Sequence, residues 1–390
     1  MEERTRRYLR GRFRDHYRQL SVTPPPDANE REWGWVTWST GGTTMVRHNS
    51  WLDIGDLETF LADERPRHVY FSAGRYDDPG ASSMSKKGWR SSDLVFDLDA
   101  DHLPGVDPET DSYGEMLETC KGALFRLLDL LEDDFGFDDL TVVFSGGRGY
   151  HVHVRDEGVK ELGRGHRREI VDYVLASDVD FDTLLQHEAV AGMGLENPAD
   201  KRTLDTTGGW GRRVQRRIDD YVDDLLELDD DDALDRLQSL DGVGEKKAQG
   251  ILRAVRTNVD QIRAGNVDVH PAFLTLARSL AEETFTGETA PIDEPVTTDI
   301  NRLIRLPGSL HGGSGLEVKR IPRAELDDFD PLHDAVPRTF VGSEIQITVP
   351  EPVDVRLGGG TFNLERGAHT VPEYVGVFLM ARGQAEKGKE

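Results

Sequence analysis

The chain has 390 residues, which is enough for two or three domains with cores of their own. Its net charge is −26, its acidic residues are scattered along the whole length, and only 10 of its 47 basic residues are lysines. No segment is apolar enough to span a membrane, the charged N-terminus has no signal-peptide core, and a single cysteine excludes a disulfide framework, so we expect a cytoplasmic protein.

Scattered acidity with few lysines indicates adaptation to a salt-rich cytoplasm. At about 1 M salt the Debye length is about 3 Å, so repulsion between surface carboxylates is screened. An acidic chain normally argues against nucleic acid as a partner, but here the acidity is global. Local basic clusters are therefore the better signal of nucleic-acid contacts.

The N-terminal part predicts a helix followed by strands. Residues 2–20 form an arginine-rich helical pattern that ends before the three prolines of SVTPPPDAN. The runs REWGWVTWS and TTMVRHNSW are aromatic and β-branched and are separated by Gly41 and Gly42, which predicts a hairpin with Arg47 on its second strand. HVYFSAG (68–74) and DLVFDLD (93–99) predict two more strands.

The stretch SDLVFDLDADH (92–102) ends with carboxylates at every second position. In a strand, Asp97 and Asp99 share one face about 7 Å apart, while Phe96 and Leu98 point into the core. Anions this close repel unless one is protonated, solvent screens them, or a divalent cation lies between them. A strand that runs out into a solvated acidic turn is the alternative.

The next segments predict an α/β (α+β) domain that is interrupted. Residues 112–135 have the spacing of an amphipathic helix with Cys120 as a buried small hydrophobe, and 141–154 predict a strand, a glycine turn and a strand. Helical patterns with hardly a strand candidate follow to about residue 285, and strand signals return at 290. We predict a catalytic domain built from two parts, residues 1–160 and 289–350. A helical insertion over residues 161–288 interrupts it, and residues 351–390 form a C-terminal tail.

Two glycine turns carry polar side chains of similar type. SGGRGYHVHV places Ser145, Arg148 and His151 around three glycines, whose N–H groups can converge on an anion. The alternatives are a tight hairpin that needs positive φ, or a metal site at His151 and His153, for which no third ligand is nearby.

A second turn, in RLIRLPGSLHGGSGLEVK, offers Arg305, Ser309, His311 and Lys319. Two basic loops together with an acidic strand end suggest a polyphosphate held beside a two-metal carboxylate site, with the ions about 3.5 to 4 Å apart. The chemistry indicated is phosphoryl or nucleotidyl transfer.

These blocks together resemble a known family. REW (31–33), VRHNSW, VFDLDAD, SGGRGYHVHV, PIDEPVTTDINRLIRLP and SLHGGSGLEVK are similar, in order and spacing, to the small catalytic subunit of archaeal and eukaryotic DNA primase, over most of residues 1–350. The resemblance implies a primase-type fold with an RRM-like catalytic half. Together with the salt-adapted composition, the resemblance implies that the source is a halophilic archaeon.

The resemblance also implies the roles of individual residues. Asp97, Asp99 and Asp293 would bind two Mg²⁺ or Mn²⁺ ions, and Glu32 and Arg47 would lie near the nucleotide and template. The contacts to the nucleotide triphosphate would be Ser145, Arg148, His151, Arg305 and His311. Many relatives carry a cysteine-rich zinc element after the acidic strand, whereas this chain has only Cys120 there.

The third carboxylate has competitors in PIDEPVTTDINRLIRL. Asp299 precedes a helically periodic apolar run, so we expect it to cap a helix. Asp293 lies between Pro291 and Pro295, in a segment that we expect to be extended, and has no such local role. It is also the position that matches the primase pattern.

The resemblance implies a DNA-directed RNA polymerase that makes short primers from NTPs on single-stranded DNA, with possible extension by dNTPs. Its partner would be a large iron–sulfur subunit, because this chain lacks cysteines for a cluster. The alternatives are a repair polymerase of the same superfamily and, in another class, a non-catalytic DNA-binding scaffold.

The insertion and the tail leave choices open. LDGVGEKKA resembles the hairpin of a helix-hairpin-helix module, in which backbone N–H groups with Lys246 and Lys247 bind a DNA phosphate, or it simply joins two helices. The four arginines of GWGRRVQRRIDDY either contact the template or pair with acidic neighbours. VPEYVGVFLMARGQAEK in the tail is either a helix packed on the body or a partner contact.

Overall fold

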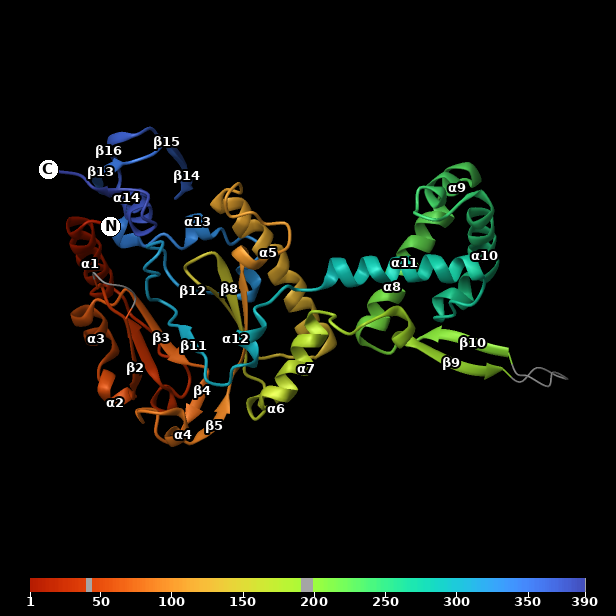
Figure 1. Cartoon of the computed structure of the whole chain (residues 1–390), viewed down its shortest axis with the longest axis horizontal. Coiled ribbons are helices and arrows are strands. Elements are labelled where there is room, and N and C mark those ends of the chain that lie inside the picture. Colours follow the sequence, from red (N-terminus) through yellow and green to blue (C-terminus); the bar gives the residue numbers. More distant parts are fainter. Residues whose placement is uncertain (40–43, 191–198, 390) are drawn as a thin grey trace. The chain divides into compact units, whose positions relative to one another are not determined.

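The computed structural model describes residues 1–39, 44–190 and 199–389. The chain divides into two compact units (Figure 1). The first unit consists of Met1–Leu128, Phe137–Val171 and Pro291–Glu390, and the second of Asp129–Gly136 and Asp172–Ala290. In the part of the chain that the structure describes, no helix is long and apolar enough to cross a membrane.

An antiparallel sheet in the first unit carries the acidic strand end. Its order is β12-β7-β8-β6, with β6 Leu94–Asp99, β7 Leu140–Phe144, β8 Gly149–Val154 and β12 Lys319–Ile321. Helix α5 (Tyr113–Asp129) covers one face, where the buried Cys120 thiol lies 3.7 Å from the Leu98 carbonyl oxygen. Because side chains alternate along β6, Asp97 and Asp99 point to the face away from α5.

A second antiparallel sheet lies against that free face. Its order is β11-β3-β1-β2, with β1 Trp33–Val36, β2 Met45–Asn49, β3 His68–Ser72 and β11 Leu303–Arg305. Phe71 of β3 stacks on His153 of β8, with ring centroids 6.2 Å apart. The predicted hairpin of β1 and β2 is confirmed, while its Gly41 and Gly42 lie outside the described residues.

Shorter elements surround these sheets. The predicted N-terminal helix is α1 (Glu3–Tyr17), which buries Leu9 and Phe13 and packs on α3. The other elements of the first unit are α2 Trp51–Ile54, α3 Leu57–Glu64, β4 Gly74–Tyr76, α4 Met84–Lys87, β5 Trp89–Ser92, α6 Glu157–Lys160, α7 Arg164–Val174 (which continues into the second unit), α12 Glu294–Thr298 and α13 Pro331–Asp334.

The C-terminal tail belongs to the first unit. It forms the strands β13 Glu344–Val349, β14 Val353–Leu357, β15 Gly360–Leu364, β16 Gly367–Pro372 and β17 Glu386–Lys387, and the helix α14 Glu373–Ala381. Every residue of α14 except Tyr374 is buried, and the helix contacts β13 and α1. Of the two readings of this segment, the structure therefore selects packing on the body.

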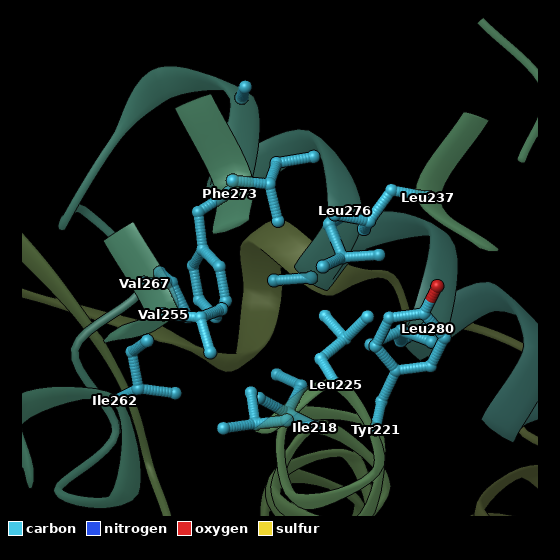
Figure 2. Packing of buried hydrophobic residues seen from close by; sticks show 14 of the residues in the cluster. Ile218, Tyr221, Leu225, Leu237, Val255, Ile262, Val267, Phe273, Leu276 and Leu280 are labelled. Carbon is cyan, nitrogen blue, oxygen red and sulfur yellow. The ribbon is translucent and has the colours of Figure 1, made fainter. Parts of the chain in front are cut away.

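The second unit has a helical core. Its helices are α8 Gly209–Glu227, α9 Asp230–Gln238, α10 Glu245–Arg263 and α11 Pro271–Glu288. Figure 2 shows Leu225, Val255 and Phe273 converging from three of them. Because this cluster consists of residues from its own unit, the insertion has a hydrophobic core of its own.

The prediction of a helical insertion with hardly a strand candidate misses one element. A two-stranded antiparallel ribbon, β9 (Leu185–Val190) and β10 (Ala199–Leu204), lies within the insertion. Its strands, LQHEAV and ADKRTL, mix polar and charged residues with few β-branched ones, so their composition carries a weak strand signal. Pairing between the two segments stabilises a conformation that neither favours alone.

Candidate active site

A cavity of about 450 Å³ in the first unit collects residues that are far apart in the sequence. Seven of the predicted site residues line it: Arg47, Asp97, Asp99, Ser145, His151, Asp293 and Arg305. The other lining residues are Met45, Tyr70, Leu98, His102, Gly149, Asp299, Asn301, Arg302, Leu303 and Ile304. The two sheets thus bring carboxylates and arginines to one place.

Strand register places the acidic strand end beside the glycine turn. Asp97 pairs with His151 across β6 and β8, and His151 Nε2 lies 3.4 Å from Asp97 Oδ1. Asp99 faces Gly149, where a Cβ atom would lie 1.8 Å from the Leu98 carbonyl oxygen. Gly146 has φ +74. Both glycines are therefore needed for the turn itself, as in the hairpin alternative, and the turn also lines the cavity.

Burial and like charge perturb the carboxylates of the cavity. Burial raises the pKa of Asp97 to about 6, an effect that Arg305 opposes and Asp99 increases. Burial and then the charge of Asp97 also raise the pKa of Asp293. Carboxylates that disfavour one another's ionisation form a site that a divalent cation would stabilise.

The histidine beside these acids is neutral. Burial, together with the charges of Arg305 and Arg302, lowers the pKa of His151 to about 3. A neutral imidazole donates from one ring nitrogen and accepts at the other. His151 can therefore donate its single N–H either to the carboxylate or to a phosphate ligand, without adding charge.

The local structure around Asp293 and Asp299 differs from the expectation. Asp293 occupies the N-cap position of α12 but makes no capping hydrogen bond through its side chain, and its backbone N–H donates to the Asp97 carbonyl at 2.9 Å. Asp299 is the C-cap residue of α12 and accepts from the Asn301 N–H at 3.0 Å. The prediction that Asp299 starts a helix is wrong, because the apolar run after it pairs with β3 as strand β11.

Arginines line the cavity together with the carboxylates. Arg305 lies on β11, and its charge acts on Asp97, His151 and His311. Arg302, three residues earlier, lines the same cavity and was not among the predicted residues. The signal for it was available, because NRLIRLP carries two arginines around one short apolar run.

Two predicted nucleotide contacts lie outside the cavity lining. Arg148 forms an ion pair with Asp101 and lines a neighbouring cavity of about 940 Å³ that also contains Tyr113. His311 lies behind the glycine turn, with its Nδ1 3.1 Å from Ser314 Oγ and its ring 4.8 Å from that of His68. Both border the site without lining it.

Glu32 is placed beneath the cavity wall rather than in it. Its side chain has no exposed surface, and its Oε1 accepts from Arg47 Nε at 3.1 Å and from the His48 backbone N–H at 3.0 Å. His48 has φ +63, a left-handed conformation next to the register shift between β1 and β2. Of this predicted pair, only Arg47 faces the ligand space.

The donor set fits hard divalent cations in its chemistry. Asp97, Asp99 and Asp293 supply carboxylate oxygens, the ligands that Mg²⁺ and Mn²⁺ prefer. Within residues 1–39, 44–190 and 199–389, no three His, Cys, Asp or Glu side chains are grouped closely enough to form a complete ligand set. The three carboxylates share one cavity, and a metal would have to draw them together.

The basic residues of the second unit that were candidates for DNA contacts differ in their surroundings. Lys246 and Lys247 are exposed in the first turn of α10, where Lys247 Nζ donates to the Gly242 carbonyl at 2.9 Å. The arginines of α8 contact acidic neighbours, in the pairs Arg212 and Arg213 with Asp134, Arg213 and Arg216 with Glu288, and Arg217 with Glu283. The salt-bridge reading of that segment is therefore correct.

A carboxylate strand end set beside an arginine-lined cavity and a glycine turn supplies the groups that nucleotidyl transfer needs. A family model described as DNA primase small subunit matches residues 96–324. Curated relatives named DNA primase small subunit PriS are 65 % identical in Haloarcula marismortui, 63 % in Natronomonas pharaonis and 61 % in Halobacterium salinarum, each over 100 % of both chains.

The chain belongs to the DNA primase small subunit family, whose members are the catalytic subunits that synthesise primers. The resemblance drawn from the sequence is thereby confirmed, and so is the α+β fold class. These relatives come from halophilic archaea, in agreement with the acidic, lysine-poor composition.

Proposed function

We propose that this cavity performs primer synthesis, with Asp97, Asp99 and Asp293 as the metal-binding carboxylates and the arginines of the cavity as the triphosphate site. The observation that carries the proposal is the meeting of these three acids with Arg302, Arg305 and three other predicted residues in one cavity. Negative and positive side chains in one cavity suit a metal-bound triphosphate, because the carboxylates can bind the metal ions and the arginines can bind the phosphates.

Two Mg²⁺ or Mn²⁺ ions bound by the carboxylates would neutralise charge on the α-phosphate and lower the pKa of the attacking 3′-hydroxyl. The chain's own residues do the rest of the work. Arg305 and Arg302 bind phosphate oxygens, Ser145 and the turn N–H groups donate to them, and neutral His151 adds one more donor. By holding the triphosphate in line with the primer end, these contacts orient the reacting groups and so lower the activation free energy.

The substrates and partners follow from the family. We propose a single-stranded DNA template, NTPs as substrates with dNTPs accepted in extension, and a large subunit that supplies the iron–sulfur chemistry, all in the cytoplasm. The hairpin before α10, with Lys246 and Lys247, would add a contact to a DNA phosphate from the second unit.

Dinucleotide formation from NTPs on a primerless template tests the activity, in high KCl, with and without the large subunit. We expect product that requires template and Mg²⁺ or Mn²⁺. A repair polymerase would extend a supplied primer but make no dinucleotide, and a scaffold would do neither. Either of these results would overturn the proposal.

Replacing His151 by Ala is expected to raise the KM for NTP by about 10- to 100-fold, because a hydrogen bond to a charged phosphate contributes about 1.5 to 3 kcal/mol. Arg148→Ala should act in the same direction, by a smaller factor, because Arg148 must first leave Asp101. Steady-state kinetics at saturating template measure both. A fall in template affinity at constant KM would assign these residues to the nucleic acid instead.

Changing Lys246 and Lys247 together to Glu should weaken single-strand or duplex DNA binding and lower the slope of log K against log salt by about two. The KM for NTP should stay within twofold. Lys86→Glu with Lys389→Glu changes the charge by the same amount at exposed positions of the first unit and serves as the control. An unchanged salt slope would reduce the hairpin to a connection between helices.

A further inference from the structure

Lys87 is a buried cation close to the candidate active site. Its side chain has no exposed surface, which is rare for lysine because a buried ammonium loses its hydration. Its Nζ donates to the Pro79 carbonyl and lies 3.5 Å from Glu32 Oε2, and the ammonium also sits over the ring of Tyr76 at 5.5 Å. Of these three partners only Glu32 is charged, so Glu32 is the group whose charge the buried ammonium balances.

Glu32 binds two cations that face different environments. Lys87 lies on its buried side, whereas Arg47 is 39 % exposed and lines the cavity. Arg47 Nε is 3.1 Å from Glu32 Oε1, and Arg47 Nη2 is 3.4 Å from Glu32 Oε2. The Glu32 carboxylate thus holds the Arg47 guanidinium in place, and its single negative charge also interacts with the Lys87 ammonium.

We propose that Lys87 is a positioning residue that neutralises Glu32, so that Arg47 stays fixed and yet keeps a net positive charge toward the phosphates of the bound ligand. Glu32, Lys87 and Arg47 together carry a charge of +1, and the only exposed member is Arg47. Without Lys87, the buried carboxylate would cancel the charge of Arg47. This inference rests on the proposed function, because it assumes that a phosphate ligand enters the cavity.

A double-mutant cycle of Lys87→Met and Arg47→Ala tests the coupling, in the full chain with its large subunit. The readouts are the KM for NTP, the Kd for single-stranded DNA, and Tm, so that a triphosphate and a template phosphate are told apart. We expect Arg47→Ala to raise one of the two constants about tenfold, and Lys87→Met to raise the same constant three- to tenfold. In the Arg47→Ala background, Lys87→Met should add less than twofold.

Lys86→Met is the matched control, because Lys86 is the exposed neighbour in α4, and it should leave both constants unchanged. If Lys87→Met is unstable, Lys87→Gln keeps a donor for the Pro79 carbonyl and should give the same pattern. Multiplicative effects of the two substitutions, or a Lys87 variant that lowers Tm but leaves both constants unchanged, would overturn the inference. Loss of all incorporation in the wild type would instead overturn the proposed function.

Discussion

Asp97→Asn is expected to lower nucleotide incorporation by about a thousandfold or more while the fold is retained. The substitution keeps the shape of the side chain and removes the charge of one carboxylate in a cluster that lines the cavity with Asp99 and Asp293. Asp99→Asn should have the same effect. Incorporation of a labelled NTP on a primed template, at saturating Mg²⁺ or Mn²⁺, measures the loss.

The same substitution should stabilise the protein in chelator. Burial and the charge of Asp99 raise the pKa of Asp97 to about 6, above the value of about 3.9 for an unfolded chain. The folded state therefore binds this proton more tightly, and wild-type stability falls as the pH rises between about 4 and 6. Asp97→Asn lacks that fall, so at pH 7 in EDTA its Tm should be higher by roughly 2 to 6 °C.

Asp63→Asn, at an exposed position of α3, makes the same charge change outside the cavity and should alter neither activity nor the pH dependence of stability. Near-native incorporation by Asp97→Asn or Asp99→Asn would contradict the assignment of these residues as ligands of two metal ions. If Asp97→Asn instead had a lower Tm than the wild type in EDTA, the ionised carboxylate of Asp97 would stabilise the fold, contrary to our expectation that it destabilises it.

Asp293→Ala is expected to eliminate catalysis with a normal Tm. Its side chain makes no capping hydrogen bond in α12, so truncation removes little local structure. Burial and the charge of Asp97 raise the pKa of Asp293, and both carboxylates line one cavity. Incorporation kinetics and thermal unfolding in high salt, measured on the same preparation, separate the two effects.

Asp299→Ala is the comparison, because Asp299 lines the same cavity but has a structural role. It accepts from the Asn301 N–H and lies 3.6 Å from Arg164, so its loss should lower Tm slightly and leave most of the activity. If Asp299→Ala abolished incorporation while Asp293→Ala preserved it, the third ligand would be Asp299.

Local patterns predicted most elements of the first unit. The alternation in LVFDLD yields β6, and the helical spacing over residues 112–135 yields α5 with Cys120 buried. The strands on either side of the glycine turn at Ser145 and the hairpin with Arg47 were also predicted correctly. For β6 and α5 the period of the apolar residues matches the residues that are buried.

The errors occur where partners distant in the sequence decide the conformation. The segment after Asp299 has apolar residues that suit a short helix or a strand equally well, and it became β11 because an edge of β3 was available to pair with it. The tail over residues 351–390 had no assigned place, because α14 is buried on nearly all sides and so has no polar face to reveal its orientation.

The sequence by itself determined the class of chemistry. Alternating carboxylates at a strand end, two basic glycine turns and their order along the chain are local features, and they were sufficient to indicate nucleotidyl transfer and the family. Only the tertiary structure decided which of the candidate side chains share a cavity, because that depends on how two sheets pack face to face. It brought in Arg302, placed Arg148 and His311 at the border, and buried Glu32 between Arg47 and Lys87.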